Sequence, residues 1–142
     1  MFNIRHHNRL EFPDKHIVVA EDDLIHQVEL MTHLSHMFDR QGKVRVSLLA
    51  GGIAVAAVLQ VEPVDLIILD FDMPYGNAAD LIDWMVSNDA KTPIITASGW
   101  EPNLAVMQDI LGKTDIPHWI YSKSQVITGE ADKHIHRLLN KE

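Results

Sequence analysis

A continuous apolar run that ends in acidic residues constrains the fold of this chain more than any other feature. Residues 64–74 read Val-Asp-Leu-Ile-Ile-Leu-Asp-Phe-Asp-Met-Pro. The length and β-branched content of this run predict a strand that is buried on both faces, as is typical of parallel sheets. Asp70 is then expected where the strand leaves the sheet, and open parallel sheets bind their ligands beyond these carboxyl ends.

An earlier apolar run ends in the same way. Residues 16–20 read His-Ile-Val-Val-Ala and are followed by Glu21, Asp22 and Asp23. Two predicted strands therefore deliver carboxylates at their C-terminal ends. Because clustered carboxylates repel one another unless a cation or a proton neutralises them, the pattern predicts a site for a divalent metal ion.

Predicted strands and helices alternate along the chain. The apolar runs predict strands over residues 17–20, 44–49, 66–70, 94–98 and 119–122. The stretches between and after them predict helices over residues 24–38, 53–60, 78–86, 103–111 and 130–140. This alternation predicts an α/β fold with a five-stranded, doubly wound parallel sheet and helices on both faces. If the strand order is 2-1-3-4-5, the first and third strands are neighbours about 5 Å apart, and their acidic ends meet.

The first predicted helix has an apolar face. Helical spacing places Leu24, Val28, Met31 and Phe38 near one side of it, whereas Glu29 lies among the polar positions. We therefore expect the apolar side to pack on the sheet.

Composition and charge narrow the classes of protein. With 142 residues the chain is long enough for one domain with a real core, and its 46% hydrophobic and 23% charged residues are typical of a globular protein. A net charge of −8 disfavours contact with the phosphate backbone of nucleic acids. The lack of cysteine excludes disulfides, and no run is apolar enough for a membrane span or a signal peptide. We therefore expect a cytoplasmic protein that binds neither nucleic acid nor membranes.

Residues 1–14 precede the alternating pattern, and we expect an N-terminal arm there, followed by one domain over residues 15–142. Phe2, Ile4, Leu10 and Phe12 make the arm partly apolar. Such an arm either docks on the domain or on a second copy, which would give a homodimer, or it is a frayed terminus.

Four segments of the sequence resemble the receiver domains of two-component response regulators, the CheY-like superfamily. They are Val-Val-Ala-Glu-Asp-Asp at 18–23, Asp-Leu-Ile-Ile-Leu-Asp-Phe-Asp-Met-Pro at 65–74, Thr-Pro-Ile-Ile-Thr-Ala-Ser-Gly at 92–99 and Tyr-Ser-Lys-Ser at 121–124. Each segment alone is a weak signal, whereas four in the correct order and at suitable spacings are specific. The resemblance covers residues 15–140 and implies the same five-stranded fold.

The resemblance also implies roles for particular residues. In receiver domains an acidic pair binds magnesium, an aspartate accepts a phosphoryl group, a serine or threonine contacts that group, and a lysine pairs with it. By position these residues are Glu21 and Asp22, Asp70, Ser98 and Lys123. Asp70 and the backbone carbonyl of Asp72 are the further implied ligands of Mg²⁺.

The implied partners are a histidine kinase or phosphotransfer protein, which donates the phosphoryl group, and a downstream protein target. The last predicted helix ends at Asn140 and the sequence ends at Glu142, so we expect a stand-alone response regulator. We expect such a chain to act by binding another protein or by passing the phosphoryl group onward in a phosphorelay, and not as an enzyme.

The sequence departs from the family pattern near the site. Ile120 stands three residues before Lys123, where family members usually have an aromatic residue that reports phosphorylation. Ser124 replaces the proline that often follows the lysine. Asp72 adds a fourth acid, which either strengthens metal binding or repels the phosphoryl group. Ile120 puts the usual aromatic switch in doubt, but neither Ile120 nor Ser124 touches the phosphorylation chemistry, and the sequence does not decide between the two effects of Asp72.

Two alternative functions stay open. Asp70-Phe71-Asp72 after an apolar strand also resembles the nucleophile motif of haloacid-dehalogenase-type phosphatases, although that motif normally ends the first strand and here ends the third. The other alternative is a receiver-like adaptor that is never phosphorylated. The complete set of acids, together with Ser98 and Lys123, argues against the adaptor.

Overall fold

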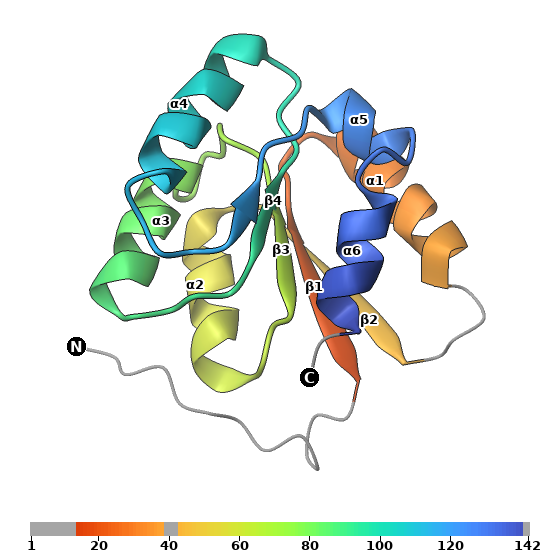
Figure 1. The fold of residues 1–142 in the computed structure, drawn as a ribbon, viewed down its shortest axis with the longest axis horizontal. Coiled ribbons are helices and arrows are strands. Elements are labelled where there is room, and N and C mark those ends of the chain that lie inside the picture. Colours follow the sequence, from red (N-terminus) through yellow and green to blue (C-terminus); the bar gives the residue numbers. More distant parts are fainter. Residues whose placement is uncertain (1–13, 39–42, 141–142) are drawn as a thin grey trace.

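Five parallel strands form one sheet in the order β2-β1-β3-β4-β5, as the sequence predicts (Figure 1). This computed structural model describes residues 14–38 and 43–140, so the predicted N-terminal arm lies outside the described residues except for Asp14. The strands are β1 (Lys15–Ala20), β2 (Val44–Leu49), β3 (Leu66–Leu69), β4 (Ile94–Thr96) and β5 (His118–Trp119). The two strands that precede the acids, β1 and β3, are neighbours.

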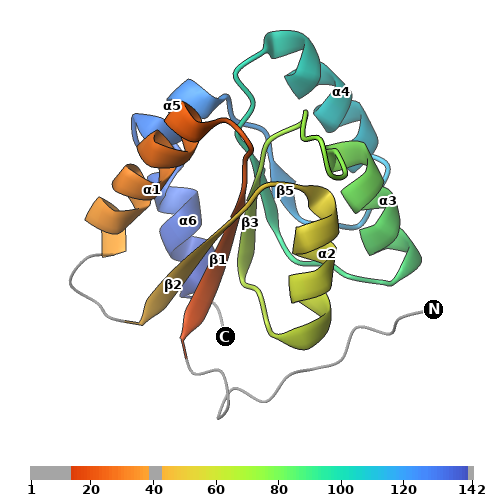
Figure 2. The ribbon, with the colours of Figure 1, turned by 180° about the vertical axis from the view of Figure 1, so that it is seen from behind.

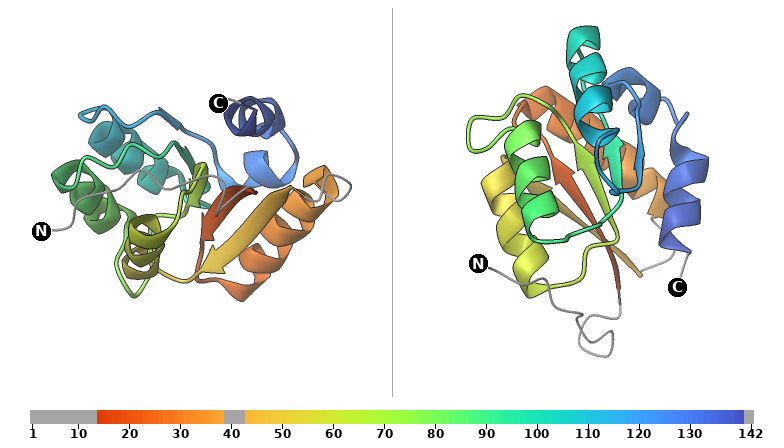
Figure 3. Two further views of the ribbon diagram at one scale, coloured as in Figure 1. Left: turned by 90° about the horizontal axis from the view of Figure 1, so that it is seen from below. Right: turned by 60° about the vertical axis from the view of Figure 1, so that its left-hand side comes forward.

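Helices cover both faces of this sheet. In the described part of the chain they are α1 (Leu24–Phe38), α2 (Gly52–Val61), α3 (Ala78–Ser87), α4 (Glu101–Leu111), α5 (Lys123–Ile127) and α6 (Asp132–Leu139). Helices α2, α3 and α4 pack on one face, and α1, α5 and α6 pack on the other (Figures 1 and 2). Figure 3 shows the sheet between these two helical layers. None of the described helices is long and apolar enough to cross a membrane.

Side chains of the central strands alternate between two hydrophobic cores. In β1, Val18 and Ala20 face the core under α2, α3 and α4, whereas Ile17 and Val19 face the core under α1, α5 and α6. Strand β3 alternates in the same way, and all four of its side chains are fully buried. Burial on both faces therefore explains the uninterrupted apolar runs of these two strands.

The buried face of α1 agrees with the predicted one only in part, because Phe38 is buried and Met31 packs against the core, whereas the other two predicted residues do neither. Leu30, Leu34 and Phe38 pack in the core, whereas Leu24 and Val28 are exposed. Residues four apart form a stripe along a helix, and Val28 lies nearly opposite Leu30 on that helix. Both stripes satisfy helical spacing, and contact with the sheet selects the one that contains Leu30.

The C-terminal part of the chain contains a helix that the sequence analysis missed. The helix predicted over residues 130–140 is α6, but the short helix α5 precedes it and begins at Lys123. Ser122 Oγ accepts a hydrogen bond from Gln125 N over 3.1 Å, and Gln125 Oε1 accepts one from Ser122 N over 2.8 Å. This capping box makes Ser122, the last residue of the predicted fifth strand, the N-cap of α5, and β5 itself covers only His118–Trp119.

The turn before α2 packs closely against the loop that follows β3. Gly52 N donates a hydrogen bond to the carbonyl of Gly76 over 2.7 Å, and Ile53 N donates one to the carbonyl of Tyr75 over 3.1 Å. A Cβ atom added to Gly51 would lie 2.4 Å from the carbonyl oxygen of Tyr75. This approach of two backbones requires glycine at position 51, and it anchors the loop that follows β3.

We expect Gly51→Ala to lower the free energy of unfolding by about 1–3 kcal/mol, the usual cost of forcing a methyl group into a packed contact. Gly99→Ala is the matched control, because a Cβ atom at Gly99 has no neighbouring heavy atom within 4 Å. Urea denaturation of the two variants measures both changes. Equal stabilities would contradict the tight contact at Gly51.

Candidate functional site

Main-chain hydrogen bonds hold the two acidic strand ends side by side. Asp70 N donates to the carbonyl of Ala20 over 3.0 Å, and Glu21 N donates to the carbonyl of Leu49 over 3.0 Å. These bonds continue the sheet one residue past β3 and β1. The sheet therefore fixes where both carboxylates emerge, in spite of the repulsion between them.

The carboxylates of Glu21, Asp22 and Asp70 lie together at this edge of the sheet. One oxygen from each residue lies within 4.8 Å of the other two, and no second group of this kind occurs within residues 14–38 and 43–140. Glu21 and Asp70 are buried, whereas Asp22 is exposed to solvent. Carboxylate oxygens that are partly open to water fit a hard divalent cation such as Mg²⁺, which keeps several of its own waters.

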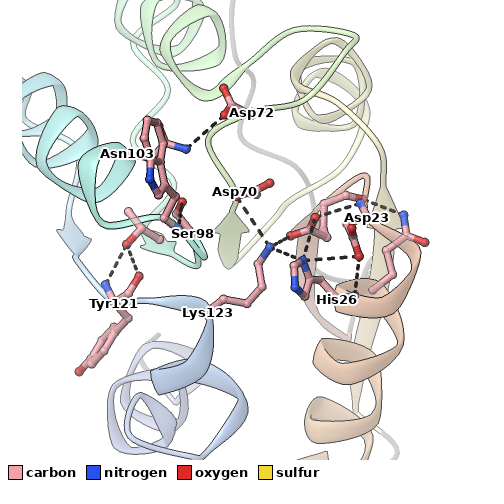
Figure 4. A network of polar contacts seen from close by, with 12 residues as sticks. Asp23, His26, Asp70, Asp72, Ser98, Asn103, Tyr121 and Lys123 are labelled. Atoms are coloured by element: carbon pink, nitrogen blue, oxygen red, sulfur yellow. Dashed lines mark hydrogen bonds and ion pairs between the residues drawn. The ribbon is translucent and has the colours of Figure 1, made fainter.

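Lys123 brings an ammonium group to these acids. Its Nζ lies 2.8 Å from Glu21 Oε2 and 4.0 Å from Asp70 Oδ1, and it donates a hydrogen bond to His26 Nδ1 over 2.7 Å (Figure 4). Lys123 N donates to the carbonyl of Ser98 over 2.9 Å, which ties the start of α5 to the segment after β4. One ammonium group thus faces three carboxylates, so the local charge stays negative.

The electrostatics of this edge disfavour ionisation of Asp70. Burial raises the pKa of Asp70 from 3.8 to about 6, and the neighbouring Glu21 carboxylate adds to the rise. The Lys123 ammonium lowers the pKa of Asp70, but it acts from 4.0 Å. An additional cation would therefore stabilise the ionised Asp70 carboxylate. A carboxyl group whose pKa is raised by burial and by a second acid is typical of functional sites.

Side chains connect the end of β4 to the segment that precedes α5. Ser98 is buried and pairs with Ser122 in an isolated parallel bridge beyond β5. Thr96 Oγ1 accepts a hydrogen bond from Tyr121 N over 2.8 Å and donates one to the carbonyl of Tyr121 over 2.9 Å. These contacts join residues 121 and 122 to the end of β4, where a longer fifth strand was predicted. They bring Ser98 and the start of α5 to the same sheet edge as the acids.

The fourth acid, Asp72, points away from the other three carboxylates. Its Oδ2 accepts a hydrogen bond from Asn103 Nδ2 over 3.2 Å, and Asn103 is buried in the first turn of α4 (Figure 4). Asn103 N donates to the carbonyl of Trp100 over 3.0 Å. The sequence analysis left the effect of the Asp72 side chain open. In the structure this side chain links the loop after β3 to α4.

The segment that lacks the usual aromatic residue still carries aromatic side chains, on the other side of the sheet. Ile120 is partly buried against the core under α2, α3 and α4. Tyr121 lies on the opposite side, where its hydroxyl hydrogen-bonds with His134 Nδ1 of α6. Trp119 also contacts the His134 ring, at 5.4 Å between centroids. The aromatic groups next to Lys123 therefore face α6 and not α4.

Three residues that contact the site, His26, Thr96 and Asn103, are not among the residues predicted from the sequence. Asp23 caps the start of α1, because Asp23 Oδ1 accepts a hydrogen bond from His26 N over 3.1 Å. The same bond holds the pKa of Asp23 below its usual value. A capping aspartate three residues before a histidine, directly after the strand-end acids, is the signal that could have placed His26 near the site. Nothing local in the sequence pairs Asn103 with Asp72, which lies 31 residues earlier.

No protein-family model matches the sequence, and no curated protein matches it. Solved structures do match its fold. The signal receiver domain of a signal transduction histidine kinase from Syntrophus aciditrophicus is 23% identical, with a TM-score of 0.65 over 90% of this chain and 95% of that chain. A DNA-binding response regulator of the LuxR family from Staphylococcus aureus is 14% identical, with a TM-score of 0.69 over 89% and 99% of the two chains.

A third similar structure contains a metal ion. It is the receiver domain of a sensor histidine kinase from Pseudomonas aeruginosa, with a magnesium ion coordinated in its active site cleft. It is 18% identical, with a TM-score of 0.63 over 90% of this chain and 99% of that chain. The chain therefore has the fold of response regulator receiver domains, as the resemblance implied.

We expect Asp70→Asn to stabilise the metal-free protein, and to do so more strongly as the pH rises. The folded-state pKa of about 6 exceeds the ordinary value of 3.8, so ionisation of Asp70 increasingly opposes folding between these pH values. Above pH 6 the raised pKa of Asp70 lowers the free energy of unfolding of the wild type by at most about 3 kcal/mol. Solvent screening makes the actual effect smaller. Urea denaturation in the presence of a chelator at about pH 4 and about pH 7.5 measures the difference.

The matched control for this experiment is Asp115→Asn, because Asp115 is exposed. Its stability should change little at either pH. A stabilisation by Asp70→Asn that is the same at both pH values would contradict the raised pKa of Asp70.

Proposed function

We propose that the chain is a receiver domain of two-component signalling that accepts a phosphoryl group on Asp70 from a histidine kinase or a phosphotransfer protein. The observation that carries the proposal is the convergence of Glu21, Asp22, Asp70 and Lys123 at one sheet edge. The similarity to solved receiver domains supports the same role. In this role the chain is a protein switch and not an enzyme.

The proposed reaction transfers the phosphoryl group in line from a phosphohistidine. An oxygen of the Asp70 carboxylate attacks phosphorus, the new P–O bond forms, and the P–N bond to the donor imidazole breaks with its electron pair left on nitrogen. The negative charge on the phosphoryl oxygens requires compensation, and Lys123 supplies an ammonium group 4.0 Å from Asp70 Oδ1. Ser98 donates its hydroxyl hydrogen bond to a phosphoryl oxygen from the end of the adjacent strand β4.

Mg²⁺ is the cofactor in this proposal. Glu21, Asp22 and Asp70 would hold the ion, with the backbone carbonyl of Asp72 as a further ligand. When bound, the ion neutralises the carboxylates and the oxygens of the incoming phosphoryl group. The cluster of acidic oxygens and the raised pKa of Asp70 support this assignment, as does the magnesium ion in the similar domain from Pseudomonas aeruginosa.

Exposed apolar side chains beside the site support a protein as the phosphoryl donor. Leu24, Ile25 and Val28 lie in the first two turns of α1 and are exposed by 72%, 69% and 58%. They follow the strand-end acids directly in the chain. A protein that brings its phosphohistidine to Asp70 would cover this surface, and exposed apolar groups of this kind are typical of protein interfaces.

We assign the downstream protein target to the surface around the start of α4. Trp100 directly precedes α4 and is 62% exposed. Trp100 N donates a hydrogen bond to Ser98 Oγ over 3.4 Å. If Ser98 turns toward a phosphoryl group on Asp70, this support of the Trp100 loop changes, which gives phosphorylation a route to the surface.

Two features argue against the phosphatase alternative. The Asp70-Phe71-Asp72 motif follows β3, the third strand along the chain, and not the first. The side chains of the two aspartates also have different neighbours, because Asp70 faces Lys123 and Asp72 binds Asn103.

We expect acetyl phosphate and Mg²⁺ to add one phosphoryl group to the wild-type chain and none to Asp70→Asn, because Asn has no carboxylate nucleophile. Intact-mass spectrometry counts the adducts, and Asp72→Asn is the matched control that should keep a single adduct. An adduct that persists in Asp70→Asn, or that maps to a histidine, would refute the assignment of Asp70. A wild-type chain without any adduct would favour the unphosphorylated adaptor.

We expect Asp22→Asn to weaken Mg²⁺ binding on the order of tenfold or more, because it removes one of three carboxylate ligands. Amide chemical shifts during a Mg²⁺ titration measure the affinity. Asp23→Asn is the control next to it, since asparagine caps a helix about as well as aspartate. An unaltered titration of Asp22→Asn would remove Asp22 from the metal site.

A further inference from the structure

His26 contacts Lys123, and the proposed roles of the acidic residues give no reason for this contact. Its Nδ1 accepts a hydrogen bond from Lys123 Nζ over 2.7 Å, which is as short as the 2.8 Å contact between Lys123 Nζ and Glu21 Oε2. Because Nδ1 accepts this bond, the ring proton lies on Nε2. The Lys123 side chain is only 7% exposed, so water cannot readily replace a partner that the ammonium loses.

The start of α1 holds His26 in this position (Figure 4). His26 N donates to Asp23 Oδ1 over 3.1 Å, and Asp23 N donates to Glu21 Oε1 over 3.0 Å. His26 Nδ1 also lies 3.5 Å from Asp23 Oδ1 and 4.0 Å from Glu21 Oε1. A chain of short contacts therefore joins the end of β1, the helix cap and the imidazole.

The two cations of the proposed site compete for Glu21. The Glu21 carboxylate pairs with Lys123 in this structure, and the same carboxylate belongs to the cluster that would hold Mg²⁺. A metal ion at Glu21 and Asp70 weakens the attraction of both carboxylates for the ammonium. His26 lies outside the acidic cluster, so it is the partner that Lys123 keeps. An ammonium group has three N–H donors, and a single bond to His26 leaves the others free for a phosphoryl oxygen.

We propose that His26 is a positioning residue that holds the Lys123 ammonium at the phosphoacceptor site when Mg²⁺ occupies the carboxylates. The inference rests on the proposed function of that site. This role accounts for the contact between a histidine of α1 and Lys123. His26 would then serve the site through Lys123, and it would bind neither the metal nor the phosphoryl group.

The test compares His26→Leu, which keeps bulk but has no acceptor, with His26→Gln, which supplies a carbonyl oxygen. Mg²⁺ affinity and the rate of phosphorylation by acetyl phosphate are measured in mildly alkaline buffer. We expect His26→Leu to weaken Mg²⁺ binding by up to about tenfold, because without His26 the ammonium depends on Glu21 and competes more strongly with the metal for that carboxylate, and to slow phosphorylation. His26→Gln should recover part of both losses. His36→Ala, at an exposed histidine of the same helix, should change neither.

The same His26 substitution in a Lys123→Met variant distinguishes positioning of Lys123 from effects of His26 that do not involve Lys123. In Lys123→Met there is no ammonium to hold, so His26→Leu should alter neither the Mg²⁺ affinity nor the residual rate. Losses of equal size in the wild-type and Lys123→Met backgrounds would overturn the proposal, as would identical behaviour of His26→Leu and His26→Gln. Mg²⁺ titration needs no phosphorylation, so a chain that accepts no phosphoryl group would refute the proposed function while the titration still tests His26.

Discussion

Repulsion between carboxylates that the sheet holds at adjacent strand ends is the constraint on which the rest of the site depends. The backbones of Asp70 and Glu21 are held at adjacent strand ends, because their N–H groups are hydrogen-bonded to the neighbouring strands. Burial and the Glu21 carboxylate together raise the pKa of Asp70, and Lys123 offsets only part of this rise. The two hydrophobic cores stabilise a fold that keeps this unfavourable arrangement at its edge. Such a trade of stability for reactivity is usual at functional sites.

The balancing charge is delivered by a segment with little strand structure of its own. Strand β5 has only two residues, and beyond it the chain is held to β4 by the Thr96 side chain and by the bridge between Ser98 and Ser122. The Ser122 capping box then starts α5, with Lys123 as its first residue. Several short contacts thus do what one longer strand would do, and the hydrogen bond from Lys123 N to the carbonyl of Ser98 joins the start of α5 to the segment after β4. A shift of the Ser98 backbone would therefore act directly on the start of α5.

The parts of the fold and site that could be predicted are those that local pattern determines. The apolar runs of β1 and β3 have no other explanation than burial on both faces, and parallel strands bring the acids that follow them to one edge. The buried face of α1 could not be predicted, because the Leu24 and Leu30 stripes both satisfy helical spacing. Helix α5 was missed although its capping box can be read in the sequence. The contact of His26 with Lys123 joins residues 97 positions apart, and only the folded chain brings them together.

In the proposed function, the first turn of α1 links the surface that would bind the donor to Lys123. Asp23 caps this turn, His26 reaches from it to Lys123, and Leu24 and Ile25 face solvent on it. A protein that covers Leu24 and Ile25 contacts the same turn that positions His26. In the proposed function, donor binding and the placement of Lys123 are thus coupled, and such coupling is reciprocal. In that proposal a phosphoryl group on Asp70 would draw the ammonium away from Glu21 while His26 keeps its bond to Lys123, so the shift of the ammonium would be passed to this turn. The donor surface then differs from the one that was bound, which gives a physical reason for the donor to leave after transfer.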